Sequence, residues 1–142
     1  MTVARIIEGR DFAVVSCESG HTVSEAVSLL AEKRIGALPV LEGGKVAGIF
    51  SERDVIYQLS ASGPEILSKP VCDVMTSPAV TVTPDTPVLA ALSLMTRRRI
   101  RHLPVVDGET MVGFISIGDL VKYRIDSIES EAEAMRSYIQ TA

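Results

Sequence analysis

The chain repeats itself, and this internal duplication constrains its fold more than any other feature. A shift of 65 residues places Val14–Leu59 on Ala79–Arg124 without a gap, and 14 of the 46 aligned positions are identical, where about three would match by chance. The matches gather in RIGALPV against RIRHLPV and in GIFSERD against GFISIGD. Each copy is therefore one supersecondary unit of about 50 residues, and the two units are expected to stack into a shared fold.

Each copy predicts the element order β–α–β–β–α, because a short apolar run, an amphipathic helix and two β-rich runs joined by a Gly-containing link follow one another. Thr22 with Glu25 three residues later predicts a capping box. In the second copy Thr86 is expected to cap, with Pro87 in the first helical position. The predicted elements are strands Ala13–Cys17, Ala37–Leu41, Val46–Phe50, Ala79–Val82, His102–Val106 and Met111–Ile115, helices Val23–Lys33 and Val88–Arg98, and final helices beginning at Ser51 and Ser116.

This order indicates a mixed α/β (α+β) fold of two β-α-β-β-α repeats with an extended C-terminal helix. We divide the chain into repeat 1 at 1–62, a linker at 63–70, repeat 2 at 71–127 and the helix extension at 128–142. The linker lies within a stretch rich in Ser, Gly and Pro, which are typical of connecting segments. Beyond repeat 2 the helical pattern continues to Ile139.

The C-terminal run carries an apolar stripe at helical spacing, with Ile125, Ile128, Ala132, Met135 and Ile139 three or four residues apart. A small domain cannot easily bury so long a stripe. An exposed apolar stripe usually meets a partner, so we expect a dimer contact or a lid across the module. The alternative is a helix that folds back on its own domain.

Composition narrows the function classes. The chain has 14 basic and 18 acidic residues and a net charge of −4, which argues against a nucleic-acid partner. No apolar run is long enough for a transmembrane helix, and the N-terminus lacks the apolar stretch of a signal peptide, so we expect a cytoplasmic protein with no membrane partner. The cysteines, Cys17 and Cys72, lack metal-ligand spacing. We interpret both as reduced packing residues and expect no metal site.

A polar motif ends each copy. The same pattern occurs at Gly48–Asp54 and Gly113–Asp119: a Gly, two apolar residues, a Ser, two further residues and an Asp. One interpretation is purely structural, because Ser is a good N-cap and an acid in the first helical turn is favourable. The other is a nucleotide site, in which Asp accepts the ribose hydroxyls and Ser with free backbone N–H groups faces phosphate. The absent side chain of each glycine allows another backbone or a ligand to approach closely.

The two copies differ in charge at one edge. Arg101 and His102 stand in the second copy where the first has Gly36 and Ala37. The guanidinium group of Arg101 can bind a phosphate with two hydrogen bonds, and His102 adds charge or a hydrogen bond near neutral pH. The alternative interpretation is two ordinary surface residues at the start of a strand.

Taken together, RIGALPV and RIRHLPV, the VCDVMT segment at Val71–Thr76 and the two Gly-to-Asp motifs resemble a tandem pair of cystathionine-β-synthase (CBS) domains, also called a Bateman module. The resemblance runs from about Val3 to Tyr123, and the long C-terminal helix is similar to that of small stand-alone bacterial CBS-pair proteins. It implies two clefts between repeats related by pseudo-two-fold symmetry, and a homodimer that forms a disc of four repeats. It also implies adenine-nucleotide ligands, with AMP first and ATP or NAD(H) as alternatives, and no required cofactor.

The resemblance also assigns roles. Asp54 and Asp119 hold ribose hydroxyls, Ser51 and Ser116 contact ribose or phosphate, and Arg53, Arg101 and His102 are the phosphate candidates. The backbones of Ala13–Cys17 and Val80–Thr83 meet the bases. Ile35–Ala37 borders the cleft of Ser116 and Asp119, and Ile100–His102 borders the other. The implied nucleotide-binding residues are Ile35, Gly36, Ala37, Gly48, Ser51, Arg53, Asp54, Ile100, Arg101, His102, Gly113, Ser116 and Asp119.

The two clefts are not chemically equal, because Gly118 stands where the first copy has Arg53. We expect one tighter site and favour the Ser116/Asp119 cleft, whose Ile35–Ala37 edge is narrow and apolar enough for adenine. Aromatic residues make up only 4% of the chain, so binding is expected to rest on aliphatic contacts and ribose hydrogen bonds.

The sequence shows no catalytic constellation: no G-x-S-x-G, H-E-x-x-H, C-x-x-C or P-loop pattern occurs. We therefore expect a non-enzymatic sensor module that acts on an unidentified regulated protein through rearrangement of its repeats or of a dimer. The alternative is a structural interaction module without a physiological nucleotide.

Overall fold

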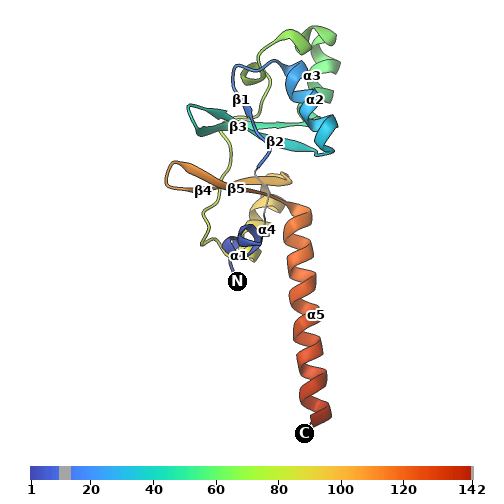
Figure 1. The fold of residues 1–142 in the computed structure, drawn as a ribbon. Coiled ribbons are helices and arrows are strands. Elements are labelled where there is room, and N and C mark those ends of the chain that lie inside the picture. Colours follow the sequence, from blue (N-terminus) through green and yellow to red (C-terminus); the bar gives the residue numbers. More distant parts are fainter. Residues whose placement is uncertain (10–13, 142) are drawn as a thin grey trace.

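The computed structural model describes residues 1–9 and 14–141 and shows two stacked repeats, with one long helix leaving the second (Figure 1). Each repeat is built on a β-hairpin covered by helices. Repeat 1 holds β1–β3 with α2 and α3, and repeat 2 holds β4 and β5 with α4 and the start of α5. The bounds are α1 Val3–Glu8, β1 Cys17–Glu18, α2 Val23–Lys33, β2 Ala37–Glu42, β3 Lys45–Ser51, α3 Glu52–Ser62, α4 Val88–Arg98, β4 His102–Asp107, β5 Thr110–Ser116 and α5 Ile117–Thr141.

The two hairpins follow from their turn chemistry and from alternating burial. In repeat 1, Gly43 and Gly44 take positive φ values of 59° and 81°, which suit the tight turns that join twisted strands. In repeat 2, Gly108 does the same at 64°. β2 pairs with β3, and β4 with β5, in antiparallel fashion, so the predicted hairpins are confirmed. Their buried faces carry fully enclosed apolar side chains such as Phe50 and Ile115.

The short opening strands are less regular than expected. In repeat 1 only Cys17–Glu18 forms a strand, β1, which pairs in parallel with β2; the prediction at Ala13 lies outside the described residues. In repeat 2 the predicted strand Ala79–Val82 is wrong, since Val82 makes only an isolated bridge to Val105. Proline has no N–H to donate to a ladder, and prolines at positions 78 and 84 enclose this segment.

The first helix of each repeat has the predicted bounds, Val23–Lys33 and Val88–Arg98. Thr22 caps α2 as expected, because its hydroxyl accepts a hydrogen bond from Glu25 N at 3.1 Å. The predicted cap at Thr86 is wrong. Pro87 occupies the N-cap position of α4 and has no hydroxyl, while the Thr86 hydroxyl accepts from Thr83 N in the preceding turn.

Segments at the edges of the repeats are exchanged between the two cores. Helix α1 lies at the start of the chain but packs on repeat 2, where Val3 is fully buried. Conversely, Val71 and Val74, which follow the linker, are buried in the core of repeat 1. The expected linker also holds a 3₁₀ helix at Pro64–Ser68 whose Ile66 is fully buried in that core. The connection is therefore a packed part of the fold.

Helix α5 begins inside repeat 2, where Leu120 is fully buried, and then extends away from both repeats (Figure 1). It is one helix of 25 residues, so the predicted extension continues the last helix of repeat 2 without a break. No helix in the described part of the chain is long and apolar enough to cross a membrane.

Candidate functional site

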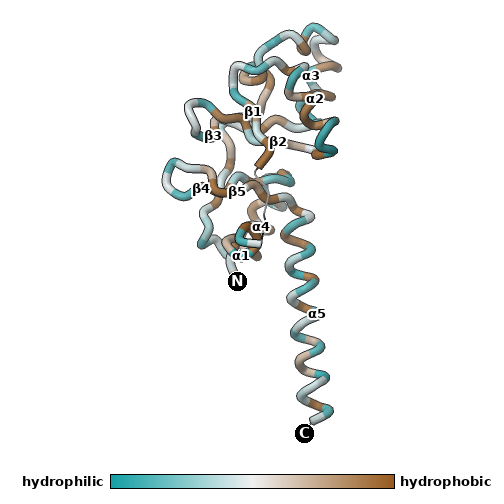
Figure 2. The backbone as a smooth tube through the Cα atoms, in the orientation of Figure 1, coloured by the Kyte–Doolittle hydropathy of each residue, from teal (hydrophilic) through white to brown (hydrophobic). Residues whose placement is uncertain are grey.

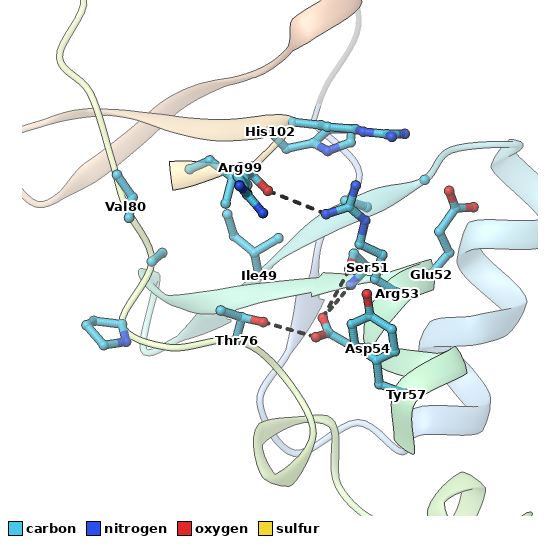
Figure 3. A pocket seen from close by; sticks show the side chains of 16 residues that line it. Ile49, Ser51, Glu52, Arg53, Asp54, Tyr57, Thr76, Val80, Arg99 and His102 are labelled. Atoms are coloured by element: carbon cyan, nitrogen blue, oxygen red, sulfur yellow. Dashed lines mark hydrogen bonds between the residues drawn. The ribbon is translucent and has the colours of Figure 1, made fainter. Parts of the chain in front are cut away.

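A cavity of about 320 Å³ lies at the junction of the two repeats (Figure 3). This volume is at the small end of the range for ligand pockets, which run from about 300 to 1,000 Å³. Its walls come from the end of β3 and the start of α3 in repeat 1, the segment that leads into repeat 2, and the start of β4. The lining residues are Gly36, Ala37, Ile49, Ser51, Glu52, Arg53, Asp54, Tyr57, Thr76, Pro78, Ala79, Val80, Arg99, Ile100, Arg101 and His102.

Asp54 is the polar centre of the cavity. Its Oδ2 accepts from Ser51 N at 2.9 Å and from Ser51 Oγ at 3.2 Å, while Oδ1 accepts from Thr76 Oγ1 at 3.0 Å. The local sequence explains this position, since Ser51 ends β3 and Asp54 stands in the first turn of α3. An ionised carboxylate offers about four acceptor sites. Asp54 therefore retains acceptor capacity toward the cavity beyond its three bonds to the protein.

The equivalent pair in repeat 2 caps α5 in the same way. Asp119 Oδ2 accepts from Ser116 N at 2.8 Å, and Ser116 Oγ accepts from Asp119 N at 3.1 Å. The structural interpretation of the repeated motif, a helix cap, is therefore confirmed for this pair. The cavity described above gathers around Ser51 and Asp54, whereas the sequence favoured the Ser116/Asp119 cleft.

Three arginines line one side of the cavity. Arg99 is the C-cap of α4 and takes a left-handed conformation, with φ of 55°, so the chain turns there and Ile100 and Arg101 run along the cavity wall. Arg53 Nη1 donates to Arg99 O at 3.4 Å, which joins α3 of repeat 1 to the end of α4 in repeat 2. Arg99 is exposed and also lines the cavity.

His102 lies on the same side, with its ring held by a stacked contact to Phe114 at a centroid distance of 5.4 Å. Burial lowers the pKa of His102 from its ordinary value of 6.5, and nearby Arg101 lowers it further, while Asp119 and Glu52 oppose the shift. The imidazole is therefore neutral at pH 7 and can act as a hydrogen-bond donor or acceptor. Glu52 belongs to the Gly-to-Asp motif of repeat 1 and Asp119 to that of repeat 2, so His102 is electrostatically coupled to both motifs.

The remaining wall is apolar, and sequence reasoning missed most of it. Ile49, Pro78 and Ala79 line it beside Val80, whose backbone we expected near a base. Tyr57 also lines the cavity with 67% of its surface exposed, so an aromatic ring is available where we expected only aliphatic contacts. One signal could have identified Tyr57: it follows Asp54 by three residues and so shares its helix face.

The edge at Ile35–Ala37 lies elsewhere than expected. Gly36 and Ala37 line the Ser51/Asp54 cavity, because Ala37 is the partner of Ser51 in the β2–β3 ladder. A Cβ built on Gly36 would lie 3.9 Å from His102 Cε1, which shows how closely the two repeats approach. Ile35 packs against the core of repeat 1. By contrast, Ile100, Arg101 and His102 border the cleft to which we assigned them.

The two motif glycines accommodate protein atoms. A Cβ at Gly48 would lie 2.7 Å from both Met75 Sδ and Thr76 O, and one at Gly113 would lie 2.7 Å from Ile7 Cγ2. Of the two alternatives for these positions, close approach of another protein segment is the one observed. The structure thus brings together eight predicted residues at one cavity: Gly36, Ala37, Ser51, Arg53, Asp54, Ile100, Arg101 and His102.

The fold and the cavity define a class of protein, namely a duplicated pair of β-α-β-β-α repeats with a polar cavity at their junction. The CBS domain family matches residues 10–61 and 71–126. The chain therefore belongs to the CBS domain family and is a tandem CBS domain pair, as the sequence motifs indicated.

Relatives share this organisation. The mitochondrial CBS domain-containing protein CBSX3 of Arabidopsis thaliana is 39% identical over 87% of this chain, which spans 63% of that protein's length. The structure of a putative signal-transduction protein with CBS domains from Burkholderia ambifaria is 37% identical, with a TM-score of 0.82 over 89% of this chain and 95% of that one. The CBS domain pair of protein MJ0100, in complex with 5-methylthioadenosine and S-adenosyl-L-methionine, is 25% identical, with a TM-score of 0.75 over 87% and 98%.

Proposed function

We propose that this chain is a non-catalytic regulatory module that binds an adenine nucleotide in the cavity around Ser51 and Asp54. One observation carries the proposal: a single cavity between the repeats joins a hydrogen-bonded carboxylate, an apolar wall and three guanidinium groups. The apolar wall suits adenine, the carboxylate can accept hydrogen bonds from ribose hydroxyls, and the guanidinium groups can bind phosphate. The solved relative MJ0100, which was crystallised with two adenosine derivatives, supports the same ligand class.

The three kinds of surface lie around one cavity. Figure 3 shows Val80 on the left, Thr76 and Asp54 along the lower side, and His102 at the top above Arg53. Stacking of a base on apolar or aromatic side chains and hydrogen bonding of its sugar to a carboxylate are compatible with this arrangement. The cavity volume of about 320 Å³ favours one mononucleotide, so AMP is the first candidate, with ATP and NAD(H) as larger alternatives.

Charge favours a phosphate at the arginine end. The charged side chains of the lining are three arginines and two carboxylates, namely Arg53, Arg99, Arg101, Glu52 and Asp54. Guanidinium groups remain protonated in proteins and bind phosphate oxygens in a bidentate manner. The neutral His102 adds a hydrogen bond without adding charge at pH 7. An anionic ligand would therefore enter a cavity with a net positive lining.

Regulation would follow from the fact that both repeats contribute residues to the cavity. Asp54 and Tyr57 belong to repeat 1, whereas Arg101 and His102 belong to repeat 2. A ligand that contacts both repeats stabilises the arrangement in which both sets are in reach, in proportion to its differential affinity for that arrangement. An unidentified protein would respond to this change.

A second candidate function is a structural interaction module with no physiological nucleotide. The observation that favours it is that both Ser–Asp pairs bond to their own helix starts, so helix capping alone accounts for the repeated residues. The two candidates differ in one respect only: the nucleotide proposal requires affinity that depends on Asp54.

The test is isothermal titration of nucleotide-stripped protein with AMP, ATP, NADH and S-adenosylmethionine, with Asp54→Ala and Asp119→Ala as a matched pair. Both variants lose the acidic residue in the first turn of a capped helix, which costs about 0.3–1 kcal/mol of stability, and Asp54→Ala also loses the hydrogen bond from Thr76 Oγ1. Only Asp54 lies in the cavity. We expect Asp54→Ala to weaken binding by about 1–3 kcal/mol, or roughly 5- to 150-fold, and Asp119→Ala to leave this binding event unchanged.

Each other outcome has a defined meaning. Loss of binding in Asp119→Ala alone would place the ligand in the other cleft, as the sequence favoured. Equal weakening in both variants would attribute the effect to helix capping and not to ligand contact. No binding of any of the four ligands would favour the interaction module.

A further inference from the structure

One face of α5, from Val121 to Ile139, carries a continuous apolar stripe that the rest of the chain leaves exposed. Its apolar side chains apart from Ala132 have 43% to 67% of their surface accessible, and brown patches recur along the tube of α5 in Figure 2. This is more apolar surface than a lone surface helix normally presents to water. The stripe consists of Val121, Ile125, Ile128, Ala132, Met135 and Ile139.

The contact of α5 with the N-terminal segment uses the opposite face of the helix. Met1 and Arg5 border a groove together with Tyr123, Asp126, Ser130 and Glu131 of α5, and Ser127 Oγ lies 3.5 Å from Met1 Sδ. At 100° per residue, the α5 positions of this groove point away from the stripe, except Glu131, which lies beside it. The alternative in which the stripe folds back on its own domain is therefore wrong for this structure.

The spacing of the stripe is that of a heptad repeat. Successive members are 4, 3, 4, 3 and 4 residues apart, which places Ile125, Ala132 and Ile139 at a positions and the other three at d positions. Apolar residues at a and d give the seam of a left-handed coiled coil. From Val121 to Ile139 the seam would extend about 27 Å at 1.5 Å per residue.

The charges beside the seam select the partner and its direction. Arg124 and Glu131 occupy g positions, and Glu129 and Arg136 occupy e positions. In a parallel dimer each g residue faces the e residue five positions later in the partner helix. Arg124 then meets the partner's Glu129, and Glu131 meets the partner's Arg136, so both pairs are of opposite charge.

An antiparallel dimer with full overlap has the reverse character. There e faces e and g faces g about the centre of the seam, so that Glu129 meets the partner's Glu129 and Glu131 meets the partner's Glu131. Like charges in these positions disfavour pairing. A second copy of this chain in parallel register is the occupant that satisfies both the apolar seam and the flanking charges.

We propose that α5 pairs along this seam, in parallel and in register, with α5 of a second copy, as a two-stranded coiled coil. The helix leaves repeat 2 along its own axis and extends beyond the folded repeats (Figure 1), and the large apolar residues of the seam are exposed to an approaching helix. The coiled coil would hold two CBS domain pairs side by side, both on the same end of the joined helices.

Disulfide trapping tests the direction of pairing on the full chain. Val121→Cys and Ile139→Cys, which stand at the two ends of the seam, are made separately in a Cys72→Ser background, because Cys72 is exposed and Cys17 is buried. In the parallel arrangement each variant cross-links to itself on oxidation and runs as a covalent dimer. In the antiparallel arrangement neither variant cross-links alone, and only their equimolar mixture does. The second result, or no cross-link in any sample, overturns the proposal.

Charge reversal tests the register by sedimentation equilibrium. Glu131→Arg should raise the dimer dissociation constant roughly tenfold, because it places two cations at each Glu131–Arg136 contact. The double variant Glu131→Arg/Arg136→Glu should restore it. Glu133→Arg is the matched control, since position 133 lies off the seam, and it should leave the constant within about twofold. Equal effects of Glu131→Arg and Glu133→Arg, or failure of the double variant to restore pairing, overturn the proposed register.

Discussion

A Gly48→Ala substitution should destabilise the protein at the point where the connecting segment crosses repeat 1. The added Cβ would lie 2.7 Å from Thr76 O, 2.7 Å from Met75 Sδ and 3.0 Å from Met75 Cγ. The Thr76 backbone cannot easily move away, because it exchanges two hydrogen bonds with Ile49, at 2.9 and 3.0 Å. Relief of the overlap therefore requires either a shift of this backbone or the loss of one of these bonds.

The magnitude follows from three contributions. Overpacking costs about 1–3 kcal/mol, and a lost backbone hydrogen bond adds about 0.5–1.5 kcal/mol. Alanine lowers the conformational entropy of the unfolded chain, which offsets about 0.4–1 kcal/mol of this loss. The net loss is about 2 kcal/mol in the free energy of unfolding, or about 8 °C in Tm for a chain of this size.

Two matched substitutions separate this cause from a general effect of alanine. At Gly113 the overlap is with Ile7 Cγ2, a side-chain atom of α1 and not a hydrogen-bonded backbone, so Gly113→Ala should cost less than Gly48→Ala. At Gly20 no atom lies within 4 Å of an added Cβ, and Gly20→Ala should be nearly neutral. Urea denaturation of the three variants measures the order. A Gly48→Ala protein as stable as the parent chain would refute the reasoning, as would a larger loss at Gly113.

The remaining predictions concern pH, thiol chemistry and an ion pair. Because burial lowers the pKa of His102, the unfolded chain takes up this proton first as the pH falls, so unfolding free energy should decrease below about pH 6.5 and His102→Gln should remove that part of the decrease. Burial, followed by the charge of Glu18, raises the pKa of Cys17 to about 11, so a thiol reagent at pH 8 should modify exposed Cys72 and leave Cys17 unreacted until the protein unfolds. Lys45→Ala, which removes the exposed 3.2 Å pair with Glu109 between the two hairpin tips, should change stability by less than about 1 kcal/mol in denaturant titration.

The elements that sequence patterns predicted well are those fixed by local chemistry. The bounds of α2 and α4 follow from apolar periodicity, and the two hairpins follow from Gly-containing turns between β-rich runs. The pairing of Ile100–His102 with the Ser51/Asp54 cleft came from the family resemblance, and the structure places these residues together at that cavity.

The misses share a physical cause, since each depends on contacts between distant segments. The packing of α1 on repeat 2, and of Val71 on repeat 1, leaves no periodic signal in either segment. Thr76 bonds to Asp54 from the connecting segment, 22 residues away, and only the fold brings them together. The preference for the Ser116/Asp119 cleft came from side-chain character alone and stays a prediction, whereas the cavity around Ser51 and Asp54 depends on how closely the repeats approach.

A chain of contacts connects the proposed ligand cavity to the proposed coiled coil. Arg101 lines the cavity, and its carbonyl oxygen accepts a hydrogen bond from Ile117 N, the first residue of α5, at 2.8 Å. On the repeat 1 side, Gly36 O accepts from Glu52 N at 3.0 Å in the equivalent position at the start of α3.

A ligand that draws the two repeats together therefore acts on the first residues of both helices at once. Since α5 is one helix from Ile117 through the seam, a change in the direction of its first turn would tilt the rest of the helix. Such a movement favours or opposes pairing of two copies only to the extent that the ligand distinguishes the two repeat arrangements. By the same reciprocity, copies joined through α5 should bind the ligand with an affinity different from that of separate copies.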